Sequence, residues 1–144
     1  MNSEDPYDLQ RFVTAQEDHY DDALEEIQSG AKKTHWMWYI FPQFAGLGQS
    51  MVSARYAIRS VDEAKAYLAH PVLGARLVEI ARATLNVEGR NAREVFGSPD
   101  DLKLKSCSTL FAHVSPDQSV FHELLNKYFG GLADGYTLRL LAKL

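Results

Sequence analysis

The chain has 144 residues, of which 46% are hydrophobic and 24% are charged, a composition typical of one folded domain with a core. Its net charge of −4, its pI of about 5.7 and the lack of any run of more than two Lys or Arg argue against nucleic-acid binding. No apolar run approaches the roughly 20 residues that a membrane-spanning helix needs, so we expect no membrane association.

The cysteine count and the first residues bear on where the protein is located. Cys107 is the only cysteine, so no disulfide can form within the chain. Residues 1–10 are acidic and polar and do not resemble a secretory or mitochondrial leader. We therefore expect a reducing, cytoplasmic location.

Charge is unevenly distributed along the chain. Residues 1–30 hold nine acidic groups and one basic group, whereas residues 31–144 hold fourteen basic and ten acidic groups. The acidic segment is typical of a solvated helical face. A second interpretation is that the basic remainder faces an anionic ligand.

Helical patterns cover most of the chain. Apolar side chains recur every three or four residues, between capping and helix-ending residues, in segments 9–16, 18–30, 60–70, 71–86, 91–97, 98–114, 117–131 and 135–144. Capping side chains are expected at Asp8, His70, Ser98, Ser115 and Asp134. In residues 71–86 the side chains predicted to point inward are Leu73, Leu77, Ile80 and Ala81.

Strand patterns are too short to build a sheet. The best candidates are residues 36–41 and 107–111. The sequence therefore predicts an all-α protein, with an N-terminal tail, residues 1–7, and a single compact domain, residues 8–144, of about seven or eight short helices.

The most unusual stretch is THWMWYIFPQFAGLGQS, residues 34–50, with two Trp, one Tyr and two Phe within eleven residues. As a helix it is apolar nearly all round, which predicts a segment buried in the core. An alternative is that Trp36 and Trp38, with His35 and Gln43 beside them, form a wall for a flat ring.

The same stretch ends in a glycine loop. Gly46 and Gly48 lack the third glycine of a dinucleotide-binding fingerprint, because Met51 stands at that position. The loop is either a plain turn or a place where the backbone passes close to an anion before a helix that starts near Ser50.

Hydroxyl groups recur at helical spacing after the loop. Ser50, Ser53 and Tyr56 lie three residues apart and share one face. Their hydroxyls can bond the carbonyl one turn back, or they can donate to a phosphate or a sugar.

A second polar stripe lies in residues 98–114. Asp101, Lys105 and Ser108 fall at positions i, i+4 and i+7, with Lys103 and Ser106 to one side. The stripe is either a surface salt bridge or an acid beside a lysine that holds an anion.

Histidine and cysteine spacing predicts no metal site. None of the five histidines pairs at i, i+4, and neither H-E-x-x-H nor C-x-x-C occurs. Cys107 lies among apolar neighbours, which is more typical of a packed thiol than of a reactive one.

Several strings in the chain together resemble one protein family. They are RFVTAQ (11–16), ALEEIQSGAKKTHWMWYIFPQFAGLG (23–48), SARYAI (53–58), EAKAYLAHPVLGARL (63–77), VFGSPDDLKLKSCSTLF (95–111) and TLRLL (137–141). Over residues 8–143 the chain resembles a bacterial family, domain of unknown function 1810, and the H-W-M-W-x-x-F-P-Q string is highly specific.

The resemblance implies a small, single-domain, all-helical protein and implies no activity. Some members carry the label calpastatin. That label describes a disordered, repetitive protease inhibitor and does not fit a compact chain.

Two functional hypotheses follow, and whether the protein is an enzyme is left open. The first is a pocket for a small anionic metabolite, such as a nucleotide or a sugar phosphate, between residues 35–53 and 101–109, without a metal or bound cofactor. Its acid–base candidates are His35 and Asp101, and its ligand-binding candidates are Trp36, Trp38, Gln43, Gly46, Gly48, Ser53, Tyr56, Lys103, Lys105, Ser106 and Thr109. The second is a protein–protein interaction module without catalytic activity, which docks a partner through acidic residues 17–26 or through the aromatic stretch.

Overall fold

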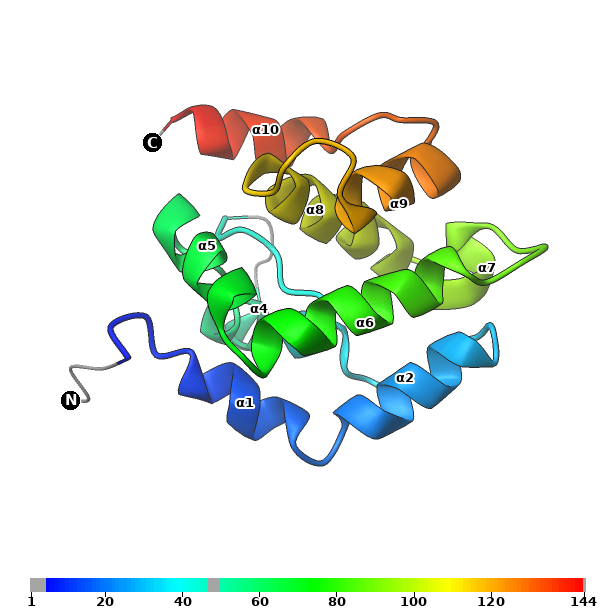
Figure 1. The fold of residues 1–144 in the computed structure, drawn as a ribbon, viewed down its shortest axis with the longest axis horizontal. Coiled ribbons are helices and arrows are strands. Elements are labelled where there is room, and N and C mark those ends of the chain that lie inside the picture. Colours follow the sequence, from blue (N-terminus) through cyan, green and yellow to red (C-terminus); the bar gives the residue numbers. More distant parts are fainter. Residues whose placement is uncertain (1–4, 47–49, 144) are drawn as a thin grey trace.

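Ten α-helices form in the parts of the chain that the computed structural model describes, residues 5–46 and 50–143 (Figure 1). They are α1 (Gln10–Gln16), α2 (Tyr20–Gln28), α3 (Met37–Ile40), α4 (Met51–Arg55), α5 (Val61–Ala69), α6 (Leu73–Leu85), α7 (Ala92–Phe96), α8 (Asp100–His113), α9 (Val120–Phe129) and α10 (Gly135–Ala142). The all-α class is confirmed. The helix count exceeds the predicted seven or eight because α3 and α4, of four and five residues, lie in the aromatic stretch and after the glycine loop, outside the eight segments predicted from the helical pattern.

Helix α6 makes its main contacts with three other helices. It packs against α2, α5 and α9, while α8 packs against α7, α9 and α10 (Figure 1). The residues of α6 that were predicted to point inward are all buried. At Gly74 a Cβ would lie 2.0 Å from the Leu68 carbonyl oxygen of α5, so only glycine permits this close approach.

None of the described helices is long and apolar enough to cross a membrane.

Two predicted helix caps are confirmed. Nδ1 of His70 accepts the backbone N–H groups of Val72 and Leu73, at 3.1 and 3.2 Å. Oδ2 of Asp134 accepts the N–H of Thr137 at 2.9 Å. Both side chains satisfy N–H groups that have no partner inside their own helix.

The other predicted caps, at Asp8, Ser98 and Ser115, are wrong. The carboxylate of Asp5 accepts the N–H groups of Leu9 and Gln10, at 2.8 and 3.0 Å, and Asp8 instead has a φ of 51°. Helix α9 begins after Ser119, whose hydroxyl forms a capping box. In both places another side chain within four positions accepts the N–H groups instead.

The aromatic stretch packs in the core, as predicted. Trp36, Met37, Ile40 and Phe41 are almost completely buried, and Pro42 follows directly after them. The residue before a proline avoids the helical region, which ends α3 after one turn. Trp38 is only half-buried.

The carboxylate of Glu26 in α2 fixes the approach to α3. Oε1 accepts the backbone N–H groups of Lys33 (2.6 Å) and Thr34 (2.9 Å) and the indole N–H of Trp36 (3.0 Å), and Oε2 accepts the Thr34 hydroxyl (2.6 Å). Partial burial by itself would raise the pKa of Glu26, but these hydrogen bonds outweigh it and lower that pKa to about 2.

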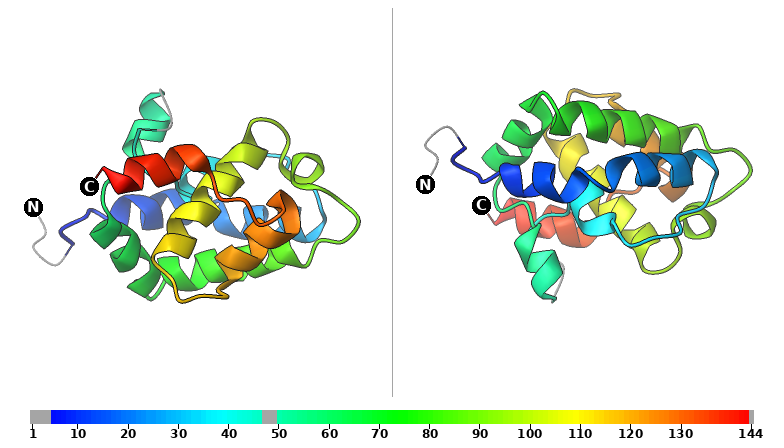
Figure 2. Two further views of the ribbon diagram at one scale, coloured as in Figure 1. Left: turned by 90° about the horizontal axis from the view of Figure 1, so that it is seen from above. Right: turned by 90° about the horizontal axis from the view of Figure 1, so that it is seen from below.

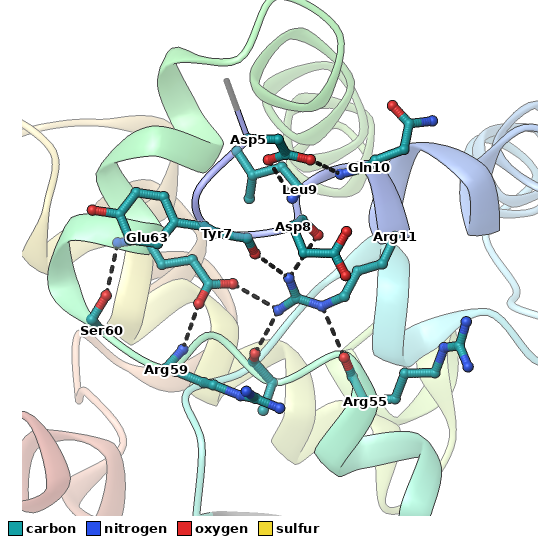
Figure 3. Close-up of polar contacts among 11 residues, drawn as sticks. Asp5, Tyr7, Asp8, Leu9, Gln10, Arg11, Arg55, Arg59, Ser60 and Glu63 are labelled. Carbon is teal, nitrogen blue, oxygen red and sulfur yellow. Dashed lines mark hydrogen bonds and ion pairs between the residues drawn. The ribbon is translucent and has the colours of Figure 1, made fainter. Parts of the chain in front are cut away.

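Arg11 holds the connection between α4 and α5 against α1 (Figure 3). Its guanidinium donates to Glu63 at 2.7 Å and to the backbone carbonyls of Tyr7, Asp8, Arg55 and Ala57. The side chains of Arg11 and Glu63 are 11% and 4% exposed, so the ion pair is screened from water. The other Glu63 oxygen accepts the backbone N–H of Arg59 at 3.0 Å.

We predict that Glu26→Gln reduces the loss of folding free energy that the wild type shows as pH falls. A carboxyl group with a lowered pKa stabilises the fold above its unfolded value, about 4.5, and this contribution is lost as pH falls toward about 2. Urea denaturation of the wild type and the variant across that range measures the difference. The control is Glu25→Gln, an exposed residue on the same helix. A pH dependence that Glu26→Gln leaves unchanged would contradict the prediction.

We also predict that Arg11→Met destabilises the fold by about 3 kcal/mol, because it leaves Glu63 buried without its counter-charge. Adding Glu63→Gln to that variant should recover part of the loss, since the unpaired charge is then gone. Thermal and chemical denaturation measure both effects, with the exposed Arg55→Ala as control. Equal stability of Arg11→Met and the wild type would refute this role.

Candidate functional site

Two adjoining cavities form a groove on the surface, and both are lined by Trp38, Gln43 and Ser53. The larger one, about 400 Å³, is called here the lysine cavity, and its other lining residues are Ser50, Pro99, Leu102, Lys103, Ser106, Asp134 and Tyr136. The smaller one, about 210 Å³, is called the arginine cavity, and its other lining residues are Phe44, Ala45, Gly46, Ala54, Tyr56, Ala57 and Arg59.

One wall of the groove comes from the loop after α3 and from α4. The loop is held by backbone hydrogen bonds from Ile58 N–H to the Gln43 carbonyl (2.9 Å) and from Ala45 N–H to the Ile58 carbonyl (2.8 Å). Helix α4 has no buried residue and projects from the body of the protein (Figure 2). Gln43 of this loop and Ser53 of α4 both line the two cavities.

The opposite wall comes from α8 and from the start of α10. The Asp134 N–H donates to Thr109 Oγ1 at 2.8 Å, and the hydroxyls of Ser106 and Thr137 lie 3.0 Å apart. Thr137 also donates its hydroxyl to Asp134 Oδ2 at 2.6 Å. This network fixes the first turn of α10 on α8, and Ser106, which bonds within it, still lines the lysine cavity.

Lys103 and Trp38 meet in the lysine cavity. The ammonium group of Lys103 lies 4.4 Å from the centroid of the Trp38 ring, which is a cation–π contact. Asp100 holds the same ammonium at 3.1 Å, and its other oxygen holds Lys32 at 2.9 Å. One carboxylate is thus shared by two lysines, and their combined charge remains positive.

The charged side chains that line the groove are Lys103, Arg59 and Asp134, with a net charge of +1. Asp134 is also engaged, because its Oδ2 caps α10. The groove therefore offers two cations, an amide and several hydroxyls beside an indole ring. That set of groups suits an anionic, partly flat ligand.

Gly46 lies at the arginine cavity with a φ of +103°, a conformation that favours glycine. A Cβ there would also approach the Leu140 side chain to 3.4 Å. The glycine is therefore explained by the backbone turn itself. Gly48, the other predicted glycine, lies outside the described residues.

The structure brings together seven of the predicted ligand-binding residues. Those in the lysine cavity are Trp38, Gln43, Ser53, Lys103 and Ser106, and the arginine cavity adds Gly46 and Tyr56. Five other predicted residues line neither cavity: His35, Trp36, Asp101, Lys105 and Thr109.

Each of those five residues has a different setting. Trp36 is buried and bonded to Glu26, as described above, and His35 is exposed at the surface. Lys105 lies over the Phe129 ring, with 5.8 Å between the ammonium and the ring centroid. Thr109 is used to hold Asp134. For Asp101, Oδ1 is buried and has no hydrogen-bond partner among the described residues.

Sequence reasoning missed Arg59, Leu102, Asp134 and Tyr136 as lining residues. Arg59 lies in the connection between α4 and α5 and belongs to neither helix, so no helical period points to it. Asp134 was recognised only as a cap, and Tyr136 follows it by two residues. The place of Asp134 and Tyr136 at the groove depends on how α10 docks on α8, which the local sequence does not encode.

The groove holds little acid–base chemistry. Among the described lining residues Asp134 is the one carboxylate, and neither His35 nor Asp101 lines a cavity. The described parts of the chain also hold no group of three or more His, Cys, Asp or Glu placed to bind a metal ion. Cys107 is buried, and burial raises the pKa of its thiol well above the usual value.

Comparison with known proteins identifies the family. A family model described as "Protein of unknown function (DUF1810)" matches residues 6–141. The chain belongs to this family. The DUF1810 resemblance predicted from the sequence strings is thereby confirmed.

A solved relative has the same fold. This DUF1810 chain is similar to the crystal structure of the conserved hypothetical protein Rv1873 from Mycobacterium tuberculosis, with 50% identity and a TM-score of 0.94. The match covers 96% of this chain and 99% of that one. A search of curated proteins finds no match.

We predict that Asp134→Ala lowers the free energy of unfolding by about 1 kcal/mol, because it removes the acceptor for the first turn of α10. Asp134→Asn should retain most of that stability, since an amide oxygen accepts the same N–H. Chemical denaturation of the two variants checks the difference. If both variants match the wild type, the cap does not stabilise α10.

Proposed function

We propose that the groove binds a small anionic metabolite, such as a nucleotide or a sugar phosphate. This proposal rests above all on the meeting of Lys103 with Trp38 and Gln43 in one cavity, since Lys103 lies far from the other two in the sequence. Distant polar and aromatic groups that converge on a cavity are typical of small-molecule sites.

Lys103 supplies the attraction for an anion. Its ammonium is half-buried, with the side chain 21% exposed, and its counter-charge Asp100 is shared with Lys32. An incoming phosphate or carboxylate therefore meets a cation that is only partly neutralised. A charge-assisted hydrogen bond to this ammonium is stronger than one between neutral groups.

The other groups of the lysine cavity suit the uncharged part of such a ligand. Trp38, Leu102 and Tyr136 offer apolar and aromatic surface, while Gln43 and Ser53 offer hydrogen bonds. The volume of about 400 Å³ falls within the range of small-molecule pockets, roughly 300–1,000 Å³. The proposal is one of binding, because Asp134, the carboxylate at the groove, is already used as a helix cap.

A second candidate function, docking of a protein partner, is favoured by exposed apolar side chains at the same groove. Leu102 is 60% exposed and Tyr136 57% exposed, although both line the lysine cavity. The aromatic stretch is a poor docking surface, because most of it is buried. A protein partner would depend on Leu102 more than on Lys103.

Thermal denaturation of the protein with and without nucleotides or sugar phosphates separates the two candidates. A ligand at 100 times its Kd adds about 2.7 kcal/mol, which raises Tm by roughly 5–10 °C for a domain of this size. We expect Lys103→Ala to remove the shift. Lys105→Ala, a lysine two positions away that lines neither cavity, should keep it.

Two results would contradict metabolite binding at this groove. One is that no compound in such a panel shifts the Tm of the folded wild type. The other is that Lys105→Ala removes the shift and Lys103→Ala does not. A protein partner that is captured by the wild type and lost in Leu102→Asp would then favour the docking function.

A further inference from the structure

Arg59 provides a second cation at the far end of the groove from Lys103. It lines the arginine cavity, whereas Lys103 lines the lysine cavity. The shared residues Trp38, Gln43 and Ser53 lie between the two ends. A ligand that contacts both cations must therefore pass over the indole and the amide.

The backbone of Arg59 is fixed while its side chain is free to bind. Its N–H donates to Glu63, which is itself held by Arg11. Among the described residues the Arg59 guanidinium has no ion pair and no hydrogen bond, and Figure 3 shows its side chain outside the bonded Arg11 cluster. The guanidinium of Arg11, by contrast, is fully used by Glu63 and four carbonyls.

The sizes of the two cavities assign different parts of a ligand to them. The arginine cavity, about 210 Å³, suits a compact anionic group, and the lysine cavity, about 400 Å³, has room for a ring as well. The planar guanidinium of arginine matches the geometry of a phosphate and can donate hydrogen bonds to two of its oxygens at once.

We propose that the groove selects metabolites with two separated anionic groups, one held by Lys103 and the other by Arg59, over metabolites with one. This inference rests on the proposed function and specifies its ligand class. The class includes nucleoside bisphosphates and sugar bisphosphates, whose two phosphates are separated by a ring. The ring would then lie against Trp38, with Gln43 and Ser53 at its edge.

The test compares two probes by isothermal titration calorimetry, adenosine 5′-monophosphate and adenosine 3′,5′-bisphosphate, with the matching pair of fructose phosphates as a second set. We expect the wild type to bind the bisphosphate of at least one pair about tenfold or more tightly than the monophosphate. Arg59→Ala should reduce that preference to near onefold, because it weakens binding of the bisphosphate more than binding of the monophosphate. Lys103→Ala should weaken both probes.

Arg55→Ala is the matched control. Arg55 is also an exposed arginine, four residues away, but it lines neither cavity of the groove. Arg55 and Arg59 together line two further cavities, one beside Arg11 and one beside Met51 and Val52 of α4. If Arg55→Ala lowers the preference as much as Arg59→Ala does, the second anion lies in one of those cavities and our assignment is overturned.

The remaining outcomes separate this inference from the function on which it rests. Equal wild-type affinities for mono- and bisphosphates, both lost in Lys103→Ala, would overturn the inference and keep the proposed function. Binding of neither probe in either pair, with no other anionic metabolite raising Tm, would overturn both. Circular dichroism of Arg59→Ala checks that the variant is folded, which we expect because its backbone contacts remain.

Discussion

The hydrogen bonds to the carboxylate of Glu26 decide how the aromatic stretch meets the rest of the fold. Four donors from residues 33–36 converge on that one group and turn Trp36 inward. Since α3 is a single turn that ends before Pro42, Trp38 comes out on the other side, half-buried. The burial of Trp36 and the position of Trp38 at the groove thus both follow from the hydrogen bonds to Glu26.

A second anchor, the ion pair of Arg11 and Glu63, fixes the connection after α4, on the same side of the groove. Arg11 satisfies the carbonyl of Arg55, at the C-terminal end of α4, and that of Ala57 in the connection after it, where the helix does not continue to pair them. Glu63 also accepts the backbone N–H of Arg59. The ion pair that stabilises the fold therefore also fixes the backbone of Arg59, which lines the groove. Stability and site geometry are therefore coupled, and a loss of Arg11 should disturb both.

The groove lies between these two anchored segments and the α8–α10 pair. Its cations come from α8 and from the connection after α4, and neither has a full counter-charge of its own. Lys103 shares Asp100 with Lys32, while Arg59 projects beyond the Arg11 cluster (Figure 3). Residues 31–144 hold fourteen basic and ten acidic groups, and the groove, whose charged lining comes from that part of the chain, has a net charge of +1.

The sequence by itself determined the helical class, most helix positions and the inward face of α6, because these depend on local periodicity and capping. It also identified the family, and it picked out Trp38, Gln43, Ser53, Lys103 and Ser106, which the structure places in one cavity. It did not separate Trp38 from Trp36 or Lys103 from Lys105, because neighbouring residues of one type look alike until packing assigns each to a side. Only the tertiary structure added Arg59, Asp134 and Tyr136, since a groove forms where segments distant in sequence dock, and no local pattern records that docking.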